Sequence, residues 1–382
     1  MSKKKIFFII IAVVVFLALA NNAEKKEQEE NNVPVPVEVT APTSRSFYMG
    51  FTQWPPEFTV DGIVGNFEKV NRYGDLNVYH QLGGVPWVEA EQGTLPARIK
   101  KDWTDLKAFF SGNKPTYVGF SPLSSTDRSG LAEYSNEKSD NEALPDDWKN
   151  LKFNDPRVIK AYTSYVDQGI QFFNPRYVAL NIEGNLLFAK NAGAFDEFVE
   201  FNKEVYTALK AKYPYITFLS IAQVEHLNGV ASDAKGKEEE LAAMEKLAQY
   251  SDAIGLSVYP YTAGKETIDA SYFDSALSLG KPLAVTESGF NSQKVKIGFT
   301  SLVGSREGQV IFETVLLETA NKNNFLFVVN WAATDYSKLI ATLPGAVRNA
   351  AKIWEFTGMY DSEGKEKPAL TVWKAYFNAP KR

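Results

Sequence analysis

Short apolar segments alternate with longer amphipathic segments from about residue 47 to the C-terminus. Most of the short segments are continuous apolar runs, which is typical of strands that are covered on both faces. They are separated by stretches whose apolar residues recur at helical spacing, as in 156–172. Eight segments are predicted as strands: 47–51, 76–80, 116–120, 177–181, 216–220, 253–258, 283–286 and 325–330. The helical stretches are 156–172, 194–212, 238–250, 272–279 and 306–321.

Eight strands that alternate with helices in one domain's length predict an α/β fold, a (β/α)8 TIM barrel over residues 46–382. An open doubly wound sheet is the alternative. It is disfavoured because no glycine-rich phosphate-binding turn follows the first predicted strand.

The N-terminal segment has a different pattern. Three lysines precede an apolar run over residues 6–20 that ends in Ala18-Leu19-Ala20, which predicts a secretory signal peptide or an uncleaved membrane anchor over residues 1–20. Residues 21–45 are polar and predict a solvated linker. The chain is therefore expected to be secreted, or held outside the cell by a membrane tether through residues 6–20.

Composition narrows the functional classes. The 382 residues carry a formal net charge of −5 with a pI near 5.4, which disfavours nucleic acid as a partner. There is no cysteine, so a disulfide framework, a structural zinc site and a thiol nucleophile are excluded. Only two histidines are present, and the sequence predicts no metal and no cofactor. It gives no information on oligomeric state.

Polar and aromatic side chains gather where the predicted strands end. In a (β/α)8 barrel the carboxyl ends of the strands form the active-site rim. Glu183 follows the strand over 177–181 and Glu287 follows the strand over 283–286. Enzymes that cleave a glycosidic bond need at least two carboxyl groups, and two glutamates on different strands could supply them. The other candidates at the rim, predicted to contact a hydroxyl-rich substrate, are Trp54, His80, Trp87, Asn181, Asn185, Tyr259 and Trp331.

Three of these strand ends resemble the clan A glycoside hydrolases, and most of all the family 53 endo-β-1,4-galactanases and related endoglycanases. The matching stretches are Asn181-Ile182-Glu183-Gly184-Asn185, Ser257-Val258-Tyr259-Pro260 and Thr286-Glu287-Ser288-Gly289. A closing segment with Gly358-Met359-Tyr360-Asp361, Lys367-Pro368-Ala369 and Trp373 is also similar. The resemblance implies a retaining (β/α)8 glycosidase acting on a β-linked polysaccharide or oligosaccharide, endo-acting.

The resemblance also implies roles. Glu287 would be the nucleophile, Glu183 the acid/base, Tyr259 a hydrogen-bond donor to the nucleophile and Trp331 the floor under the sugar. Two departures stand out. Ile182 replaces the asparagine that usually precedes the acid/base, so that Asn181 or Asn185 would have to contact the sugar. No arginine ends the second predicted strand.

Other interpretations stay open. Each candidate has a structural alternative, such as a buried carboxylate, a core aromatic or an asparagine that braces a turn. Glu225 and His226 follow the fifth predicted strand, where surface exposure competes with a binding role. The polar insertion over 124–149 is expected either to wall the cleft or to be flexible. At the level of function, a non-catalytic carbohydrate-binding surface protein and a transglycosylase are the alternatives to a hydrolase.

Overall fold

The computed structural model describes residues 40–81 and 83–382. The predicted signal peptide or anchor over 1–20, and the linker over 21–45 except for its last six residues, lie outside these ranges. Arg45, at the end of the predicted linker, is buried and forms a 2.6 Å ion pair with Asp75. The folded domain therefore includes this residue.

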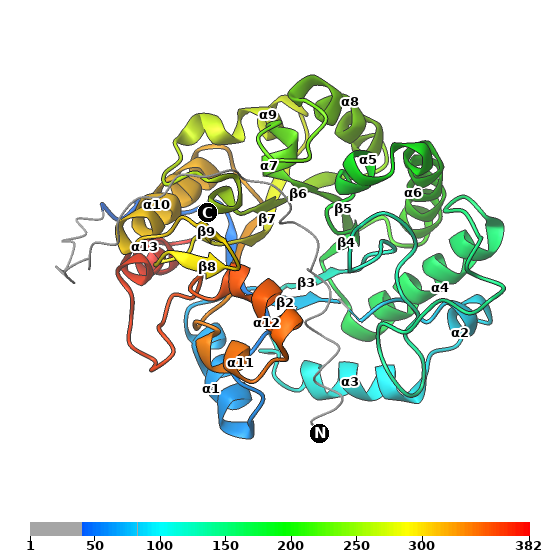
Figure 1. Cartoon of the computed structure of the whole chain (residues 1–382), viewed down its shortest axis with the longest axis horizontal. Helices are drawn as coiled ribbons and strands as arrows, with labels where there is room; N and C mark the ends of the chain where they lie inside the picture. Colours follow the sequence, from blue (N-terminus) through cyan, green and yellow to red (C-terminus); the bar gives the residue numbers. More distant parts are fainter. Residues whose placement is uncertain (1–39, 82) are drawn as a thin grey trace.

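Eight parallel strands form one sheet in the order β1-β10-β7-β6-β5-β4-β3-β2 (Figure 1). All eight strands predicted from the sequence are present. They are β1 (Tyr48–Phe51), β2 (Asn77–His80), β3 (Thr116–Gly119), β4 (Tyr177–Asn181), β5 (Thr217–Gln223), β6 (Ala253–Val258), β7 (Leu283–Ser288) and β10 (Phe327–Asn330).

The first two strands close this sheet into a barrel. The backbone N–H of Leu76 donates to the Met49 carbonyl at 3.1 Å. At the carboxyl ends of the same two strands, the Gln53 side-chain amide donates to the His80 carbonyl at 2.7 Å and accepts from the His80 N–H at 3.2 Å. One glutamine side chain thus replaces strand pairing where β1 and β2 diverge. The closed (β/α)8 barrel is confirmed, and the open doubly wound sheet is wrong.

Helices surround the ring of strands (Figure 1). They are α1 (Val60–Arg72), α2 (Trp87–Glu91), α3 (Ala97–Lys107), α4 (Pro156–Phe173), α5 (Leu186–Lys190), α6 (Ala192–Lys212), α7 (Val224–Leu227), α8 (Lys237–Ala248), α9 (Asp274–Ser278), α10 (Arg306–Lys322), α11 (Ser337–Ala341), α12 (Gly345–Ala351) and α13 (Pro368–Asn378). The described residues also form the short 3-10 helices η2 (Pro260–Ala263), η3 (Ala270–Phe273) and η4 (Lys352–Trp354) and a hairpin of β8 (Val295–Ile297) and β9 (Thr300–Leu302).

Local sequence explains where the longer helices begin and end. The side chain of Asp155 caps α4 by accepting from the Arg157 N–H, and Pro156 occupies the first turn, where its missing N–H costs nothing. Asn174 ends the same helix in the left-handed conformation, at φ 48°. The Ser305 hydroxyl caps α10 in the same way as Asp155.

The core has two layers, as expected for this fold. An inner cluster fills the barrel and includes Tyr117, Ile182 and Phe327, all buried. A larger outer cluster lies between the strands and the helices. Ile182 belongs to the inner cluster, so the residue before Glu183 is a barrel-filling side chain.

Candidate active site

Glu183 lies on a strained turn just beyond β4. Its φ is 54°, in the left-handed region that non-glycine residues rarely adopt and that costs roughly 1–3 kcal/mol. The next residue, Gly184, donates its N–H to the Ile221 carbonyl of β5 at 2.8 Å. The turn is therefore fastened to the neighbouring strand. This fastening holds the Glu183 side chain above the barrel interior.

Three donors from different parts of the chain surround the Glu183 carboxylate. Its Oε1 accepts from the Ser257 hydroxyl at 2.8 Å and from the Gln223 amide at 3.3 Å. Its Oε2 lies 3.4 Å from Nη2 of Arg128. The side chain keeps 12% of its surface exposed. Glu183 is thus held firmly at one oxygen and more loosely at the other.

Glu287 belongs to β7 and is more deeply buried. Its Oε2 accepts from the Tyr259 hydroxyl at 2.9 Å. Burial and the nearby charge of Glu183 raise the pKa of Glu287 to about 8, while the Tyr259 hydrogen bond and the charge of Arg128 oppose this rise. The two carboxyl groups therefore share one electrostatic site, in which the proton of one depends on the charge of the other.

His80, at the end of β2, lies directly beneath Glu287. Its Nε2 is 3.1 Å from the Thr286 carbonyl, which can only accept, so Nε2 carries the hydrogen. Its Nδ1 then faces Oε1 of Glu287 at 3.9 Å, too far for a hydrogen bond. Burial lowers the pKa of His80 to about 4, so the ring is neutral at pH 7. The side chain has no exposed surface, so in this structure it offers no contact to a substrate, contrary to the prediction.

Aromatic side chains extend from Glu287, starting with Tyr259, which donates to it. Trp331 follows β10, retains 7% exposure and stacks on Trp354 with ring centroids 5.4 Å apart and planes at 28°. Tyr259, which binds Glu287, meets both indoles edge-on at 6.4 Å. Trp54 follows β1 and is half-buried. Trp54 and Trp331 thus follow strand ends, and their contact with a sugar stays a prediction.

The predictions for Trp87, Asn181 and Asn185 do not fit their positions. Trp87 has no exposed surface; it stacks on Trp148 and donates its indole N–H to the Ala132 carbonyl. Such a side chain offers no face to a sugar.

Both asparagines are also fully buried, and their amides are already bound within the protein. Asn181 donates to Asn202 and Ser220 and accepts from the Ile221 N–H. Asn185 donates to the Gln223 carbonyl at 3.1 Å and accepts from the Gln223 N–H at 2.9 Å. They brace the strands, so neither replaces the usual asparagine before Glu183.

Arg128 is the main site residue that the sequence did not reveal. It comes from the insertion after β3, the segment 124–149, and brings a guanidinium to Glu183. Its backbone is in the left-handed region at φ 59°, and its side chain also donates to the Ser124 carbonyl. The insertion therefore forms part of the site. Nothing in the local sequence marks Arg128, because only the folded path of the insertion brings it to Glu183.

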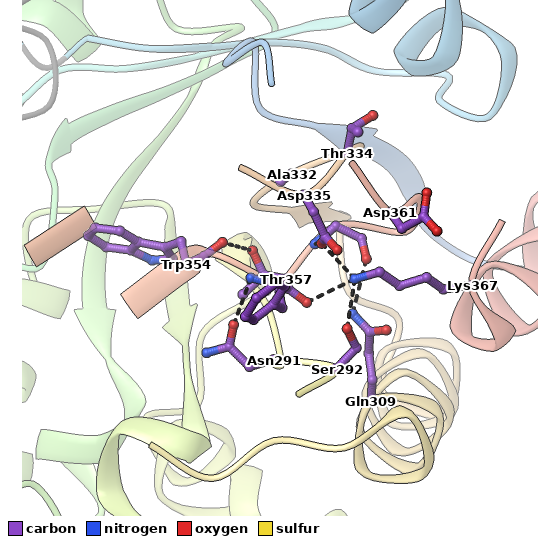
Figure 2. Close-up of polar contacts among 12 residues, drawn as sticks. Asn291, Ser292, Gln309, Ala332, Thr334, Asp335, Trp354, Thr357, Asp361 and Lys367 are labelled. Atoms are coloured by element: carbon purple, nitrogen blue, oxygen red, sulfur yellow. Dashed lines mark hydrogen bonds and ion pairs between the residues drawn. The ribbon is translucent and has the colours of Figure 1, made fainter. Parts of the chain in front are cut away.

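A buried polar network lies next to the segment that carries Trp354 (Figure 2). The Lys367 ammonium donates to Asp335 at 2.6 Å, to Ser292 at 2.9 Å and to the Phe356 carbonyl at 3.0 Å. Asp335 also accepts from the Gly358 N–H at 2.9 Å. Burial raises the pKa of Asp335 to about 6 and lowers that of Lys367. The network ties the loops after β7 and β10 to the segment that carries Trp354.

The part of the chain that the structure describes contains neither a cluster of metal ligands nor a helix able to span a membrane. Among residues 40–81 and 83–382, no group of three or more histidine or acidic side chains is arranged to hold a metal ion. Within the same ranges, no helix has the length and apolarity needed to cross a membrane.

Comparisons with known proteins identify the class of fold. No family model and no curated protein sequence matches the chain. Among solved structures, an exo-β-1,4-mannosidase from Opitutaceae bacterium strain TAV5 is 14% identical with a TM-score of 0.59, covering 88% of this chain and 60% of that one. A GH5_18 protein from Streptomyces cattleya, in complex with Manβ1-4GlcNAc, is 15% identical with a TM-score of 0.60, covering 88% and 83%. The GH53 catalytic domain of Ignisphaera aggregans is 16% identical with a TM-score of 0.53, covering 90% and 98%.

These likenesses, at 14–16% identity, show that the chain shares the (β/α)8 fold of these three structures. The fold implied by the motif resemblance to clan A is thereby confirmed, with family 53 as one of several families of the same fold. The chain spans 60% of the length of the mannosidase that it matches.

Proposed function

We propose that the protein is an exported retaining glycoside hydrolase that cleaves a β-linked glycan with Glu287 as nucleophile and Glu183 as acid/base. One observation carries the proposal: the ends of β4 and β7 bring the carboxyl groups of Glu183 and Glu287 so close that the charge of Glu183 raises the pKa of Glu287, and Tyr259, which donates to Glu287, meets Trp331 edge-on. Structural carboxylates seldom occupy a shared site of this kind, because like charges raise the cost of burying both. Two of the similar structures are an exo-β-1,4-mannosidase and a GH5_18 protein in complex with Manβ1-4GlcNAc, which supports a β-linked substrate.

The site supplies each step of a double displacement. In the reactive form the shared proton of the pair lies on Glu183 and Glu287 is ionised. A carboxylate oxygen of Glu287 then attacks the anomeric carbon, while Glu183 gives its proton to the leaving oxygen. Glu183 then removes a proton from water, which attacks the glycosyl-enzyme ester and releases Glu287. Because Oε1 of Glu183 is held by Ser257 and Gln223, its Oε2 is the oxygen free to transfer the proton once the guanidinium of Arg128 moves aside.

A non-catalytic carbohydrate-binding protein is the second candidate. It is favoured by the absence of an asparagine before Glu183: Ile182 fills the barrel interior, and the amides of Asn181 and Asn185 are bound elsewhere. The usual contact to the sugar 2-hydroxyl is therefore missing. Export rests on the N-terminal sequence over residues 1–20.

The deciding experiment measures turnover of aryl β-glycosides and β-linked polysaccharides by the wild type, Glu183→Ala and Glu287→Ala. We expect both variants to lose most activity. Azide should rescue each with opposite stereochemistry on an activated β-glycoside. In Glu287→Ala it replaces the nucleophile and gives the α-glycosyl azide, whereas in Glu183→Ala it attacks the covalent intermediate and gives the β-glycosyl azide. No turnover by the wild type, with glycan binding that survives both substitutions, would favour the binding protein instead.

A further inference from the structure

A chain of polar side chains runs from Glu183 to the protein surface. The Gln223 amide donates to Oε1 of Glu183 at 3.3 Å, and its carbonyl oxygen lies 2.5 Å from Nδ1 of His226. The other ring nitrogen, Nε2, lies 3.0 Å from Asp233. Asp233 is 30% exposed and pairs with Lys190 at 2.5 Å. The chain connects the end of β5, the short helix α7 and the loop that follows it.

His226 is at the centre of this chain and has no exposed surface. Its Nδ1 faces the Gln223 amide oxygen, which can only accept, so Nδ1 carries a hydrogen, and its Nε2 faces the Asp233 carboxylate. The carboxyl groups of Asp233, Glu225 and Glu240 also interact with His226 electrostatically.

The His226 contact determines which way the Gln223 amide points. With the Nδ1 hydrogen donating to the amide oxygen, the amide NH2 is directed at Glu183. A flipped amide would place its NH2 against the Nδ1 hydrogen and its oxygen against the Glu183 carboxylate, and both contacts would be repulsive. The backbone of Gln223 is fixed separately, because Asn185 bonds both its N–H and its carbonyl. Only the side-chain amide therefore depends on His226.

We propose that His226 is a positioning residue that acts through Gln223 on Glu183. By holding the Gln223 NH2 against Oε1, it fixes the rotation of the carboxyl group and leaves Oε2 to transfer the proton. This inference rests on the proposed function, in which Glu183 is the acid/base. The sequence placed His226 on a loop with surface exposure as an equal alternative, but the structure buries it in contact with the candidate site.

Two substitutions separate the two sides of the imidazole ring. The side-chain NH2 of asparagine can take the place of Nδ1, so His226→Asn keeps a donor for Gln223 and loses the contact with Asp233. The longer side chain of glutamine reaches the place of Nε2, so His226→Gln keeps the contact with Asp233 and loses the donor for Gln223. We expect kcat to remain near the wild-type value in His226→Asn and to fall on the order of 10²-fold in His226→Gln.

A double-mutant cycle tests whether the effect passes through Gln223. In a Gln223→Leu background, His226→Gln should cause little further loss of kcat, because the amide that it positions is gone. The pH dependence of kcat/KM should differ from wild type in His226→Gln and not in His226→Asn. The opposite order of the two His226 variants, or losses of kcat that add fully in the double variant, would overturn the proposal in favour of a purely structural role for His226.

A measurement that does not depend on turnover separates this inference from the proposed function. If the wild type cleaves no glycoside, the proposed function fails, and the side-chain NH2 signals of Gln223 in an NMR spectrum decide the positioning role alone. Donation to Glu183 predicts that these signals shift in Glu183→Ala and in His226→Gln, and keep their wild-type positions in His226→Asn. Equal signals in all four proteins would contradict the hydrogen-bond chain.

Discussion

At the scale of single residues, the Tyr259 hydroxyl is the direct hydrogen-bond donor to Glu287. Its hydrogen bond favours the ionised carboxylate and keeps the pKa of Glu287 lower than burial alone would set it. Tyr259→Phe should therefore raise this pKa further. A nucleophile must be ionised, so the acid limb of the kcat/KM profile should move to higher pH. At pH 6 we expect a loss of about 10²-fold, comparable with removal of one preorganised donor.

Tyr261 offers a matched control for this measurement. It is buried close to Tyr259, and its hydroxyl has no hydrogen-bond partner in the part of the chain that the structure describes. Tyr261→Phe removes the same atom without removing a hydrogen bond, so its pH profile should match the wild type. Equal shifts in the two variants would show that the Tyr259 hydrogen bond does not set the ionisation of Glu287.

Arg128 acts on the same carboxyl group through its charge. Its guanidinium lowers the pKa of Glu287, so Arg128→Gln should raise that pKa and move the acid limb of kcat/KM to higher pH. Arg128→Lys keeps the positive charge and should leave the limb near its wild-type position. The pH profiles of the two variants check this. If the acid limb moved equally in Arg128→Gln and Arg128→Lys, the effect would come from the hydrogen bonds of the guanidinium group and not from its charge.

The sequence revealed the site residues whose position depends on a strand end, and missed those that depend on a loop. Glu183, Glu287 and Tyr259 each follow a predicted strand, and the barrel brings strand ends together. Arg128 depends on the path of an irregular insertion. Trp87 also follows a strand, but Trp148 from the same insertion covers it, which no local pattern indicates.

At the scale of elements, Lys367 holds the segment between β10 and α13 on the barrel. Its partner Asp335 is equally buried, with only 3% of each side chain exposed. Lys367→Met leaves a buried carboxylate without its cation, so the free energy of unfolding should fall by roughly 3–5 kcal/mol. Urea titration measures the loss.

Two further variants test the Lys367 assignment. Adding Asp335→Asn to Lys367→Met removes the uncompensated charge but keeps an oxygen that accepts from the Gly358 N–H, so part of the lost stability should return. Lys374→Met breaks a pair with Glu366 at the surface and should cost no more than about 1 kcal/mol. Equal losses in Lys367→Met and Lys374→Met would refute the role of the buried pair.

The observed ends of the strands agreed best with the predicted ends where turn residues bounded the apolar run in the sequence. The predicted strand 177–181 coincides with β4, and 253–258 coincides with β6. The fifth strand continues to Gln223, three residues beyond the predicted end, because Ala222 and Gln223 pair with Leu256 and Ser257 of β6. This pairing is a tertiary contact, and it also brings Gln223 within reach of Glu183.

At the scale of the whole molecule, several buried carboxyl groups make stability depend on pH. Burial raises the pKa of Glu225 to about 7 and the pKa values of Glu287 and Glu313 to about 8. Between the usual glutamate pKa and these values, the folded chain binds more protons than the unfolded chain. The free energy of unfolding therefore falls as pH rises through this window, by up to about 1.4 kcal/mol per pH unit for each group.

His80 has the opposite effect at lower pH. Its folded pKa of about 4 lies below the ordinary value of 6.5, so the unfolded chain takes up the extra proton as pH falls from 6.5 to 4. Above pH 6.5 His80 no longer contributes to the slope, whereas the three carboxyl groups do. We therefore expect the free energy of unfolding, from urea titrations at fixed temperature, to decrease steadily from pH 6.5 to 8.5. Constant stability across this interval would contradict the expectation.

Glu313 allows this pH dependence to be tested away from the candidate site. It is buried on α10, and its Oε2 has no hydrogen-bond partner within the described residues, so burial alone accounts for its raised pKa. Glu313→Gln removes one titrating group and should flatten the decline between pH 6 and 8 by about 1.4 kcal/mol per pH unit. Glu318→Gln, at an exposed position of the same helix, should leave the slope unchanged. The free energies of unfolding of the wild type and Glu313→Gln could instead show the same slope against pH across this range. In that case Glu313 would have the same protonation state in the folded and the unfolded chain, and other groups would cause the pH dependence.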